Sequence, residues 1–453
     1  LFLSMNFFAM KNHLLVLLAL WTILFQQSLA QYVTIPDPMF ELILMQKYPS
    51  CFNQDQEMDT TCTDIVTEIK LDFRDLGIMN FSGIEFFDNL DTLICSGNIV
   101  GELETFPAGL SYLDCSRSEI AILSGLPSGL TYLNCSGNNI DSLPALPATL
   151  KYLDCSDTHP SLQSISVLPQ GLEYLNCSNN YHNSLPALPN SLQYLDCSNN
   201  IMTSLPILPQ SLTHLICDSS KLNNLPALPP SLTYLDCSNN LFLSSLSGLP
   251  QSLTHLNCSK IGISSLPVLP QSLTYLNCSK ITGLNTLPTL PQTLTHLICD
   301  SSSLSSLPIL PQTLNHLDCS INQISNISAL PPGLQYFDCS YNPNMSFPAA
   351  LPPTLTVLKC SGINLGGLPA LPSGLIELDC SGNPLMNLPA LPPTLVYLNC
   401  WRNQLDSLPA LPTGLKQLLC LENNLTNLPA LPDSLQILNC HGNQLTILPT
   451  LPQ

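Results

Sequence analysis

The sequence predicts a solenoid of short stacked coils, with a curved parallel β-sheet on its concave face and little helix. Eighteen cysteines recur from Cys95 to Cys440 at intervals of 20, 21 or, once, 22 residues. The composition agrees with this, because only 9% of the 453 residues are charged while 45% are hydrophobic and 41 are proline. A globular enzyme normally carries more charge, and a disordered chain carries fewer apolar residues. The regular period therefore indicates a repeat protein.

Each repeat contains one short strand. In the frame Leu232-Thr-Tyr-Leu235-Asp-Cys237, inward Leu and Cys alternate with residues that point outward. This period of two is typical of a strand with one buried face. Stacked coils place such strands side by side, about 4.8 Å apart, as a parallel sheet.

An asparagine follows most strands, and we expect it to turn inward and bond the backbone of adjacent loops. It stands at Asn98, Asn138, Asn180, Asn200, Asn240, Asn322, Asn342, Asn383, Asn403, Asn423 and Asn443. Ile261, Ile281 and Ile363 occupy the same place in three coils, which we expect to be locally less regular.

The segment LPxLP forms the back of most coils. Two prolines three residues apart remove backbone donors and fix φ, which excludes a helix and favours an extended, polyproline-type path. The convex side of the solenoid is therefore predicted to be extended.

The full repeat, LxxLxCxxNxLxxLPxLPxx, resembles the leucine-rich-repeat consensus over residues 66–453, or about 19 coils. It is similar to the short-repeat bacterial class, which includes the LPX-type effectors delivered by type III secretion. Those effectors typically have an aliphatic residue where this chain has Cys. Some carry a ubiquitin-ligase domain after the repeats, and no segment of this sequence resembles that domain. The resemblance implies a protein that works by binding.

The first 30 residues resemble a signal peptide. An apolar run from Leu14 to Phe25 is too short to span a membrane, and Ser28 and Ala30 suit cleavage after Ala30. We therefore expect a secreted or cell-surface protein with no membrane insertion after cleavage. Residues 31–65 are predicted to cap the first coil, and their IPDxxF motif resembles internalin-like amino-terminal modules. Because the last coil stops in mid-repeat, we also expect the sequence to be a fragment.

The twenty cysteines fall into two classes. The eighteen periodic cysteines occupy inward positions, and we expect them to be buried free thiols rather than disulfides or metal ligands. Cys51 and Cys62 lie outside the period in the predicted cap, where we expect a disulfide. The sequence predicts no metal site and no cofactor.

The outward residues of the strands form three columns. The first is aromatic, the second contains Asp and Asn, and the third is mostly Ser. Tyr supplies contact area at low entropic cost, and rings beside carboxylates also suit sugars. Alternatively, the columns stabilise a solvated sheet, with Asp and Asn alternating so that carboxylates do not face each other. The predicted ligand-binding residues are Tyr112, Asp114, Tyr132, Asn134, Tyr152, Asp154, Tyr174, Asn176, Tyr194, Asp196, Tyr234 and Asp236.

The net charge and the placement of the histidines argue against several classes of function. With a net charge of −19 and only 12 Lys and Arg, nucleic acid is not an expected partner. His296 and His316 lie on adjacent coils near Asp300 and Asp318, yet the repeat itself places them there, so neither a metal site nor catalysis is predicted.

We expect an extracellular adhesion module that binds a protein or carbohydrate on its concave face. The alternatives are a structural spacer for a missing carboxy-terminal domain, or the repeat part of an LPX-type ubiquitin-ligase effector that lacks its catalytic domain.

Overall fold

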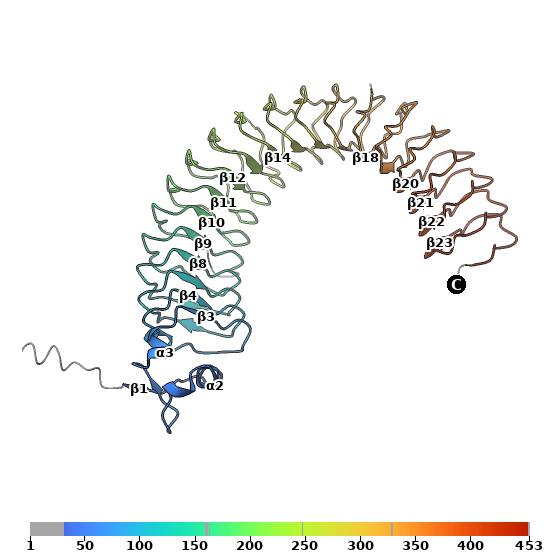
Figure 1. Ribbon diagram of the computed structural model, residues 1–453. Helices are drawn as coiled ribbons and strands as arrows, with labels where there is room; N and C mark the ends of the chain where they lie inside the picture. The colour runs from blue at the N-terminus through green and yellow to red at the C-terminus, as the bar shows by residue number, and fades with distance from the viewer. Residues whose placement is uncertain (1–30, 159–161, 163, 247, 328, 452–453) are drawn as a thin grey trace, which may run out of the picture. The chain divides into compact units, whose positions relative to one another are not determined.

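The computed structural model describes residues 31–158, 162, 164–246, 248–327 and 329–451, so the predicted signal segment lies outside it. The chain divides into two compact units, residues 1–172 and 173–453, and each is considered by itself. Both units are built of coils that contribute one short strand each to a parallel sheet (Figure 1). None of the helices in the described ranges combines the length and the apolar character that a membrane crossing requires.

The first unit begins with a small module. Its helix α2 (Pro38–Lys47) starts where the Asp37 carboxylate accepts hydrogen bonds from the backbone N–H groups of Met39 and Phe40, at 2.9 and 2.8 Å. Phe40 and Leu44 are the buried residues of this helix. The remaining elements are β1 (Tyr32–Val33), which pairs antiparallel with β2 (Met58–Asp59), and the short helices η1 (Pro49–Cys51), α3 (Thr63–Val66) and η2 (Ile84–Phe86).

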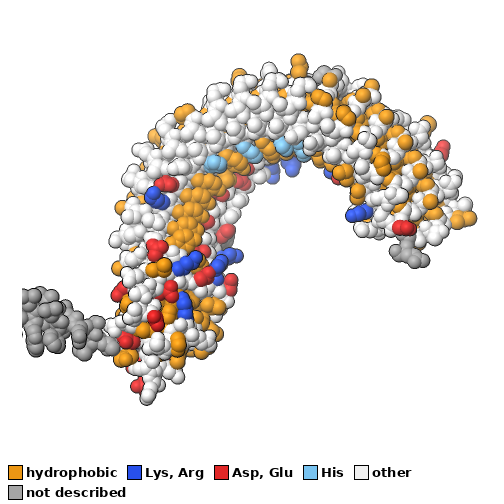
Figure 2. Space-filling view, viewed as in Figure 1, with side chains coloured by type: hydrophobic (Ala, Val, Ile, Leu, Met, Phe, Trp, Pro, Cys, Tyr) orange, Lys and Arg blue, Asp and Glu red, His pale blue; other side chains and the backbone are white. Residues whose placement is uncertain are grey.

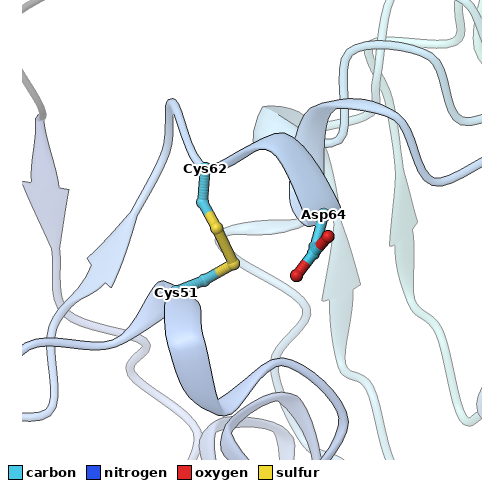
Figure 3. A group of neighbouring side chains, drawn as sticks. All are labelled: Cys51, Cys62 and Asp64. Atoms are coloured by element: carbon cyan, nitrogen blue, oxygen red, sulfur yellow. A yellow bond between two sulfur atoms is a disulfide. The ribbon is translucent and has the colours of Figure 1, made fainter.

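A disulfide joins Cys51 and Cys62 in this module, and their Cα atoms are 5.5 Å apart. This is the disulfide that the sequence predicts. It connects η1 to the start of α3 (Figure 3). The carboxylate of Asp64 lies close to the two sulfurs, in the only such group of potential metal ligands within the described ranges. Because both sulfurs are bonded to each other, neither is a thiolate, and the group does not form a metal site.

The coils of the first unit form a parallel sheet in which each strand pairs in register with the next. Its strands are β3 (Lys70–Asp72), β4 (Thr92–Ile94), β6 (Tyr112–Asp114), β8 (Tyr132–Asn134) and β9 (Tyr152–Asp154). A second, two-stranded parallel sheet joins β5 (Glu102–Leu103) to β7 (Ile122–Leu123) on the return path of two coils. These two coils lack the full LPxLP segment, so their backbone keeps the N–H donors that a ladder needs.

The second unit continues the same architecture with fourteen parallel strands, each in register with the next along the chain. In Figure 1 its strands line the inner side of the curve that its coils describe. The strands are β10 (Tyr174–Asn176), β11 (Tyr194–Asp196), β12 (His214–Ile216), β13 (Tyr234–Asp236), β14 (His255–Asn257), β15 (Tyr275–Asn277), β16 (His296–Ile298), β17 (His316–Asp318), β18 (Tyr336–Asp338), β19 (Val357–Lys359), β20 (Glu377–Asp379), β21 (Tyr397–Asn399), β22 (Gln417–Leu419) and β23 (Ile437–Asn439). The predicted solenoid, with its parallel sheet and little helix, is confirmed.

Leucines and cysteines fill the interior, as the alternation predicts. On most strands the central residue is buried while its two neighbours are half-buried, and the cysteine that follows is buried as well. All eighteen periodic cysteines are free thiols, and all but the half-buried Cys440 are buried, which confirms the prediction for seventeen of them. Burial raises the pKa of the Cys135 thiol to about 12, so it stays neutral. Several thiols also contact the backbone of the next strand, such as Cys217 Sγ with the Asp236 carbonyl oxygen at 3.4 Å.

The asparagine that follows most strands connects two coils. The side chain of Asn240 accepts a hydrogen bond from Leu222 N, in the preceding coil, at 3.0 Å. Its Nδ2 donates at 3.0 Å to the carbonyl oxygens of Cys217, in the preceding coil, and Cys237, in its own. Each asparagine therefore satisfies backbone groups of the coil before it as well as those of its own.

The three isoleucine coils keep their strand register, so the expected irregularity is wrong for the sheet. It is met in the turn of the Ile281 coil, where Leu284 N donates to the Ile281 carbonyl at 3.1 Å. For the other two isoleucines, the irregular turn lies in the coil before. Before Ile261 and Ile363 no asparagine amide is available, and the Leu243 and Met345 N–H groups donate within their own turns, to the Asn240 and Asn342 carbonyls. The coil of Ile363 itself is regular, because Asn383 in the following coil accepts from Ile363 N at 3.1 Å.

We predict that Asn240→Ala lowers the free energy of unfolding by about 3 kcal/mol, because it leaves several buried backbone groups without partners at roughly 1–3 kcal/mol each. Urea denaturation followed by circular dichroism measures the change. Asn224→Ala, at an exposed position outside the strands in the coil before Asn240, is the matched control and should change stability by less than about 0.5 kcal/mol. Equal effects of the two substitutions would contradict the stabilising role of the Asn240 hydrogen bonds.

Candidate functional site on the strand face

The outward sides of the strands form one surface in each unit, which we call the strand face. Its first column consists of half-buried rings. In the first unit, Tyr132 stacks between Tyr112 and Tyr152, with ring centroids 4.0 and 4.2 Å apart and interplanar angles of 6° and 11°. The strands are in register, so equivalent side chains lie directly beside one another and their rings become parallel.

The second unit carries a longer ring column. Tyr174 and Tyr194 stack at 4.3 Å, and the column continues through histidines and tyrosines to Tyr336, beside which lies the ammonium group of Lys359, 5.6 Å from the ring centroid. Figure 2 shows the histidines as a pale blue row among hydrophobic side chains on this face. The successive members after Tyr194 are His214, Tyr234, His255, Tyr275, His296, His316 and Tyr336, with centroids 4.1 to 6.0 Å apart.

Stacking determines what these rings present to a ligand. Where the centroids are about 4 Å apart, each ring covers the flat face of its neighbour, so the ring edges and polar tips point away from the sheet. Burial raises the pKa of Tyr132 and Tyr234, so their hydroxyls remain protonated at neutral pH and can donate hydrogen bonds. The column is therefore an amphipathic ridge rather than a set of open ring faces.

The Asp and Asn column is held by the serines of the third column. The Asp114 carboxylate accepts from Ser116 N at 3.1 Å and from Ser116 Oγ at 2.7 Å, and Asn134 accepts in the same way from Ser136. These bonds require only a carbonyl-type oxygen, so Asp and Asn are interchangeable. Most of the serines are buried and do not belong to the accessible surface, contrary to their expected outward position: Ser116, Ser156, Ser178, Ser198, Ser238, Ser279, Ser320, Ser340, Ser361 and Ser381.

The alternation of Asp and Asn also has a structural cause. Asn257 Nδ2 donates to Asp236 Oδ2 at 2.8 Å, and Asn399 Nδ2 donates to Asp379 Oδ2 at 2.9 Å. An amide facing a carboxylate thus supplies a hydrogen bond as well as avoiding repulsion. This favours the stabilising role that the sequence left open for this column.

The second column also places two carboxylates opposite each other. Asp318 and Asp338 face each other on adjacent strands. Burial, together with the neighbouring carboxylates Asp338 and Asp300, raises the pKa of Asp318. Burial also raises the pKa of Asp338, although Lys359 on the next strand opposes the shift.

The histidines do not form a metal site with these carboxylates. His296 and His316 stack with ring centroids 5.4 Å apart, and the described residues bring no group of histidines and carboxylates into common ligating distance. Burial lowers the pKa of His316, and His296 beside it lowers the pKa further. Neutral imidazoles suit a stacked column better than charged ones.

The structure distributes the predicted ligand-binding residues over the strand faces of both units. Tyr112, Asp114, Tyr132, Asn134, Tyr152 and Asp154 lie together in the first unit, and Tyr174, Asn176, Tyr194, Asp196, Tyr234 and Asp236 lie in the second. The sequence prediction did not find a hollow near Gly362, Gly382 and Trp401. The signal for it is a departure from the repeat, since Trp401 stands where most coils have Ser.

Comparison with known proteins gives structural matches only. No protein-family model and no curated protein sequence matches the chain. YopM from Yersinia enterocolitica WA-314 is 33% identical, with a TM-score of 0.66 over 85% of this chain and 90% of YopM. YopM from Yersinia pestis, described as a leucine-rich effector protein, is 28% identical, with a TM-score of 0.43 over 85% of this chain and 86% of that one. The functional domain of InlJ from Listeria monocytogenes, described as including a cysteine ladder, is 24% identical, with a TM-score of 0.47 over 82% and 71%.

We predict that Asp318→Asn stabilises the protein at neutral pH by about 0.5–1 kcal/mol, because it removes facing carboxylates and keeps the oxygen that accepts from Ser320. The folded pKa of Asp318 is raised, so its stabilising contribution is complete below the unfolded pKa of about 3.9 and is lost as the pH rises through the folded pKa. The gain should therefore vanish near pH 3.

Urea denaturation at pH 7 and about pH 3 measures this effect. Asp379→Asn is the matched control, because Asp379 faces Lys359 and accepts a hydrogen bond from Asn399. It should give no gain at pH 7. A gain from Asp318→Asn that persists unchanged at the lower pH would show that charge is not its cause.

Proposed function

Because the chain belongs to the leucine-rich-repeat family, together with YopM, we propose that it is a protein-binding module whose strand face contacts the partner. The observation that supports this most strongly is the ring column, which runs through Tyr174, Tyr194 and Tyr234 in the second unit. Tyrosine edges provide apolar contact area with a hydroxyl at the tip, and such residues carry much of the binding energy in protein interfaces.

The geometry favours a protein over a carbohydrate on this face. A sugar ring packs best on an open aromatic face, and here most ring faces are covered by neighbouring rings about 4 Å away. A protein contacts ring edges, hydroxyls and half-buried carboxylates equally well. With a net charge of −19, the chain would also attract a basic partner surface and steer its approach.

The proposed place of action is outside the cell or on its surface. The signal-like residues 1–30, with cleavage after Ala30, support export, and the disulfide between Cys51 and Cys62 suits an oxidising compartment. We propose residues 31–65 as an internalin-like cap and residues 66–453 as the binding repeats. An adhesive role is the finer form of this proposal.

A structural spacer is the second candidate, and the hydrogen bonds within the polar columns favour it. Ser238 N donates to Asp236, which in turn accepts from Asn257, so the second column stabilises the sheet without any ligand. The two functions make different demands on the ring column, because a binding module contacts its partner through the rings whereas in a spacer they only stabilise the sheet.

We predict that Tyr234→Ala weakens binding of the full chain to its protein partner at least tenfold, equivalent to about 1.4 kcal/mol, because the change removes a ring from the column. Screening the full chain against arrays of extracellular proteins and of glycans identifies a partner, and titration calorimetry measures the change.

Phe242→Ala is the matched control, because this exposed aromatic residue lies outside the strands and should not affect affinity. If folded Tyr234→Ala binds as tightly as the unsubstituted chain, the strand face is not the contact surface. Binding to glycans alone would instead contradict the preference for a protein.

A further inference from the structure

A second feature of the second unit lies beside the strand face, in the turn after each strand. The second residue after each periodic cysteine has positive φ, and we call this series the turn column. From Asn179 to Tyr341 it carries a side chain in every coil. It is interrupted at Gly362 and Gly382 and resumes at Arg402.

The interruption leaves a hollow of about 470 Å³ in the surface. The backbone at Gly362 and Gly382 contributes to its lining, together with the side chains of Tyr341, Trp401 and Arg402. Gln404 also lines it. This volume is in the range of small-ligand sites.

The rings here differ from those of the strand face. Tyr341 and Trp401 are 58% and 38% exposed, and neither stacks on another aromatic ring within the part of the chain that the structure describes. Trp401 replaces the serine that bonds the second column elsewhere, and only its backbone N–H donates to Asn399. Aromatic surface is therefore accessible in this hollow, whereas it is covered along the ring column.

The polar groups in the hollow favour an anion. The Gly362 and Gly382 N–H groups donate to the carbonyls of Ser381 and Trp401, at 2.9 and 2.8 Å, so the backbone there is already satisfied. Free donors come from side chains, above all the guanidinium of Arg402, which forms no ion pair within the described ranges. No carboxylate lines the hollow, and Glu422 follows Arg402 in the turn column without lining it.

We propose that this hollow binds an acidic monosaccharide unit of a glycan, with the sugar ring against Trp401 or Tyr341 and its carboxylate at Arg402. Accessible aromatic surface suits the apolar face of a pyranose, and a guanidinium binds a carboxylate through two parallel hydrogen bonds. Gln404 supplies both a donor and an acceptor for sugar hydroxyls. The site is separate from the proposed protein-binding strand face and does not depend on that function.

Tryptophan fluorescence gives a direct test, because the chain has only two tryptophans, Trp21 and Trp401. In the full chain with Trp21→Phe, Trp401 is the only reporter. A galacturonic acid trisaccharide should change its emission with saturation, and the methyl ester of the same trisaccharide, which lacks the charges, should bind at least tenfold more weakly.

Two substitutions use residues that the repeat already accepts at these positions, so the fold should be retained. Arg402→Asn should weaken trisaccharide binding at least tenfold. Gly382→Asn fills the hollow and should abolish binding, since asparagine has positive φ at Asn199 and Asn239, and a Cβ at Gly382 meets other atoms only at 3.7 Å or more. Tyr234→Ala, on the strand face, should leave trisaccharide binding unchanged.

Several results would overturn the proposal. They are the absence of saturable binding of the trisaccharide, equal binding of the acid and its ester, and unchanged affinity in Arg402→Asn or Gly382→Asn. An acidic peptide such as Glu-Phe that saturates the site where the trisaccharide does not would assign it to a peptide instead. Loss of protein binding in Tyr234→Ala has no bearing on these outcomes, so the two proposals fail independently.

Discussion

The structure depends on one constraint, which is that every coil turns sharply while its backbone polar groups are buried. The row of inward asparagines after the strands, which we call the asparagine ladder, meets this constraint. Each amide accepts from an N–H group of the preceding coil and donates to carbonyls of both coils. Hydrophobic burial of Leu and Cys drives the stacking, but it does not specify the turn. Where the ladder is interrupted at Ile261, the N–H of Leu243 finds a partner within its own turn. The N–H groups of the turns are thus satisfied either by an asparagine of the next coil or by a carbonyl of the same turn. The strands stay in register in both cases.

Much of the fold could be predicted from the sequence, because two periods act together. Alternation within LxxLxC gives the strand, and the spacing of about 20 residues gives the stack. The short strands β5 and β7 were not predicted, since they depend on the absence of LPxLP in two coils and on the pairing of their return paths. The place of the irregular turns before Ile261 and Ile363 was also missed, because it depends on which coil each asparagine serves.

The candidate site was only partly predictable, for a physical reason. Sequence columns show which side chains share a face, but they do not show that stacked rings cover one another or that Ser116 is buried beneath Asp114. The hollow at Gly382 is harder still to predict, because it arises from missing side chains in a column that otherwise has them. The two successive glycines in the turn column, Gly362 and Gly382, are the sequence feature that indicates the hollow.

The direction of the asparagine ladder has a consequence for how such a protein lengthens during evolution. Because each coil is completed by the amide of the coil that follows it, a duplication leaves no buried group unsatisfied when it copies a whole number of coils. The identical segments THLICDSS at 213–220 and 295–302 stand at the same place in two coils, as copying of whole coils requires. A duplication that keeps this phase inserts a coil whose donors and acceptors are already matched, whereas one out of phase leaves buried groups unsatisfied on both sides of the insertion.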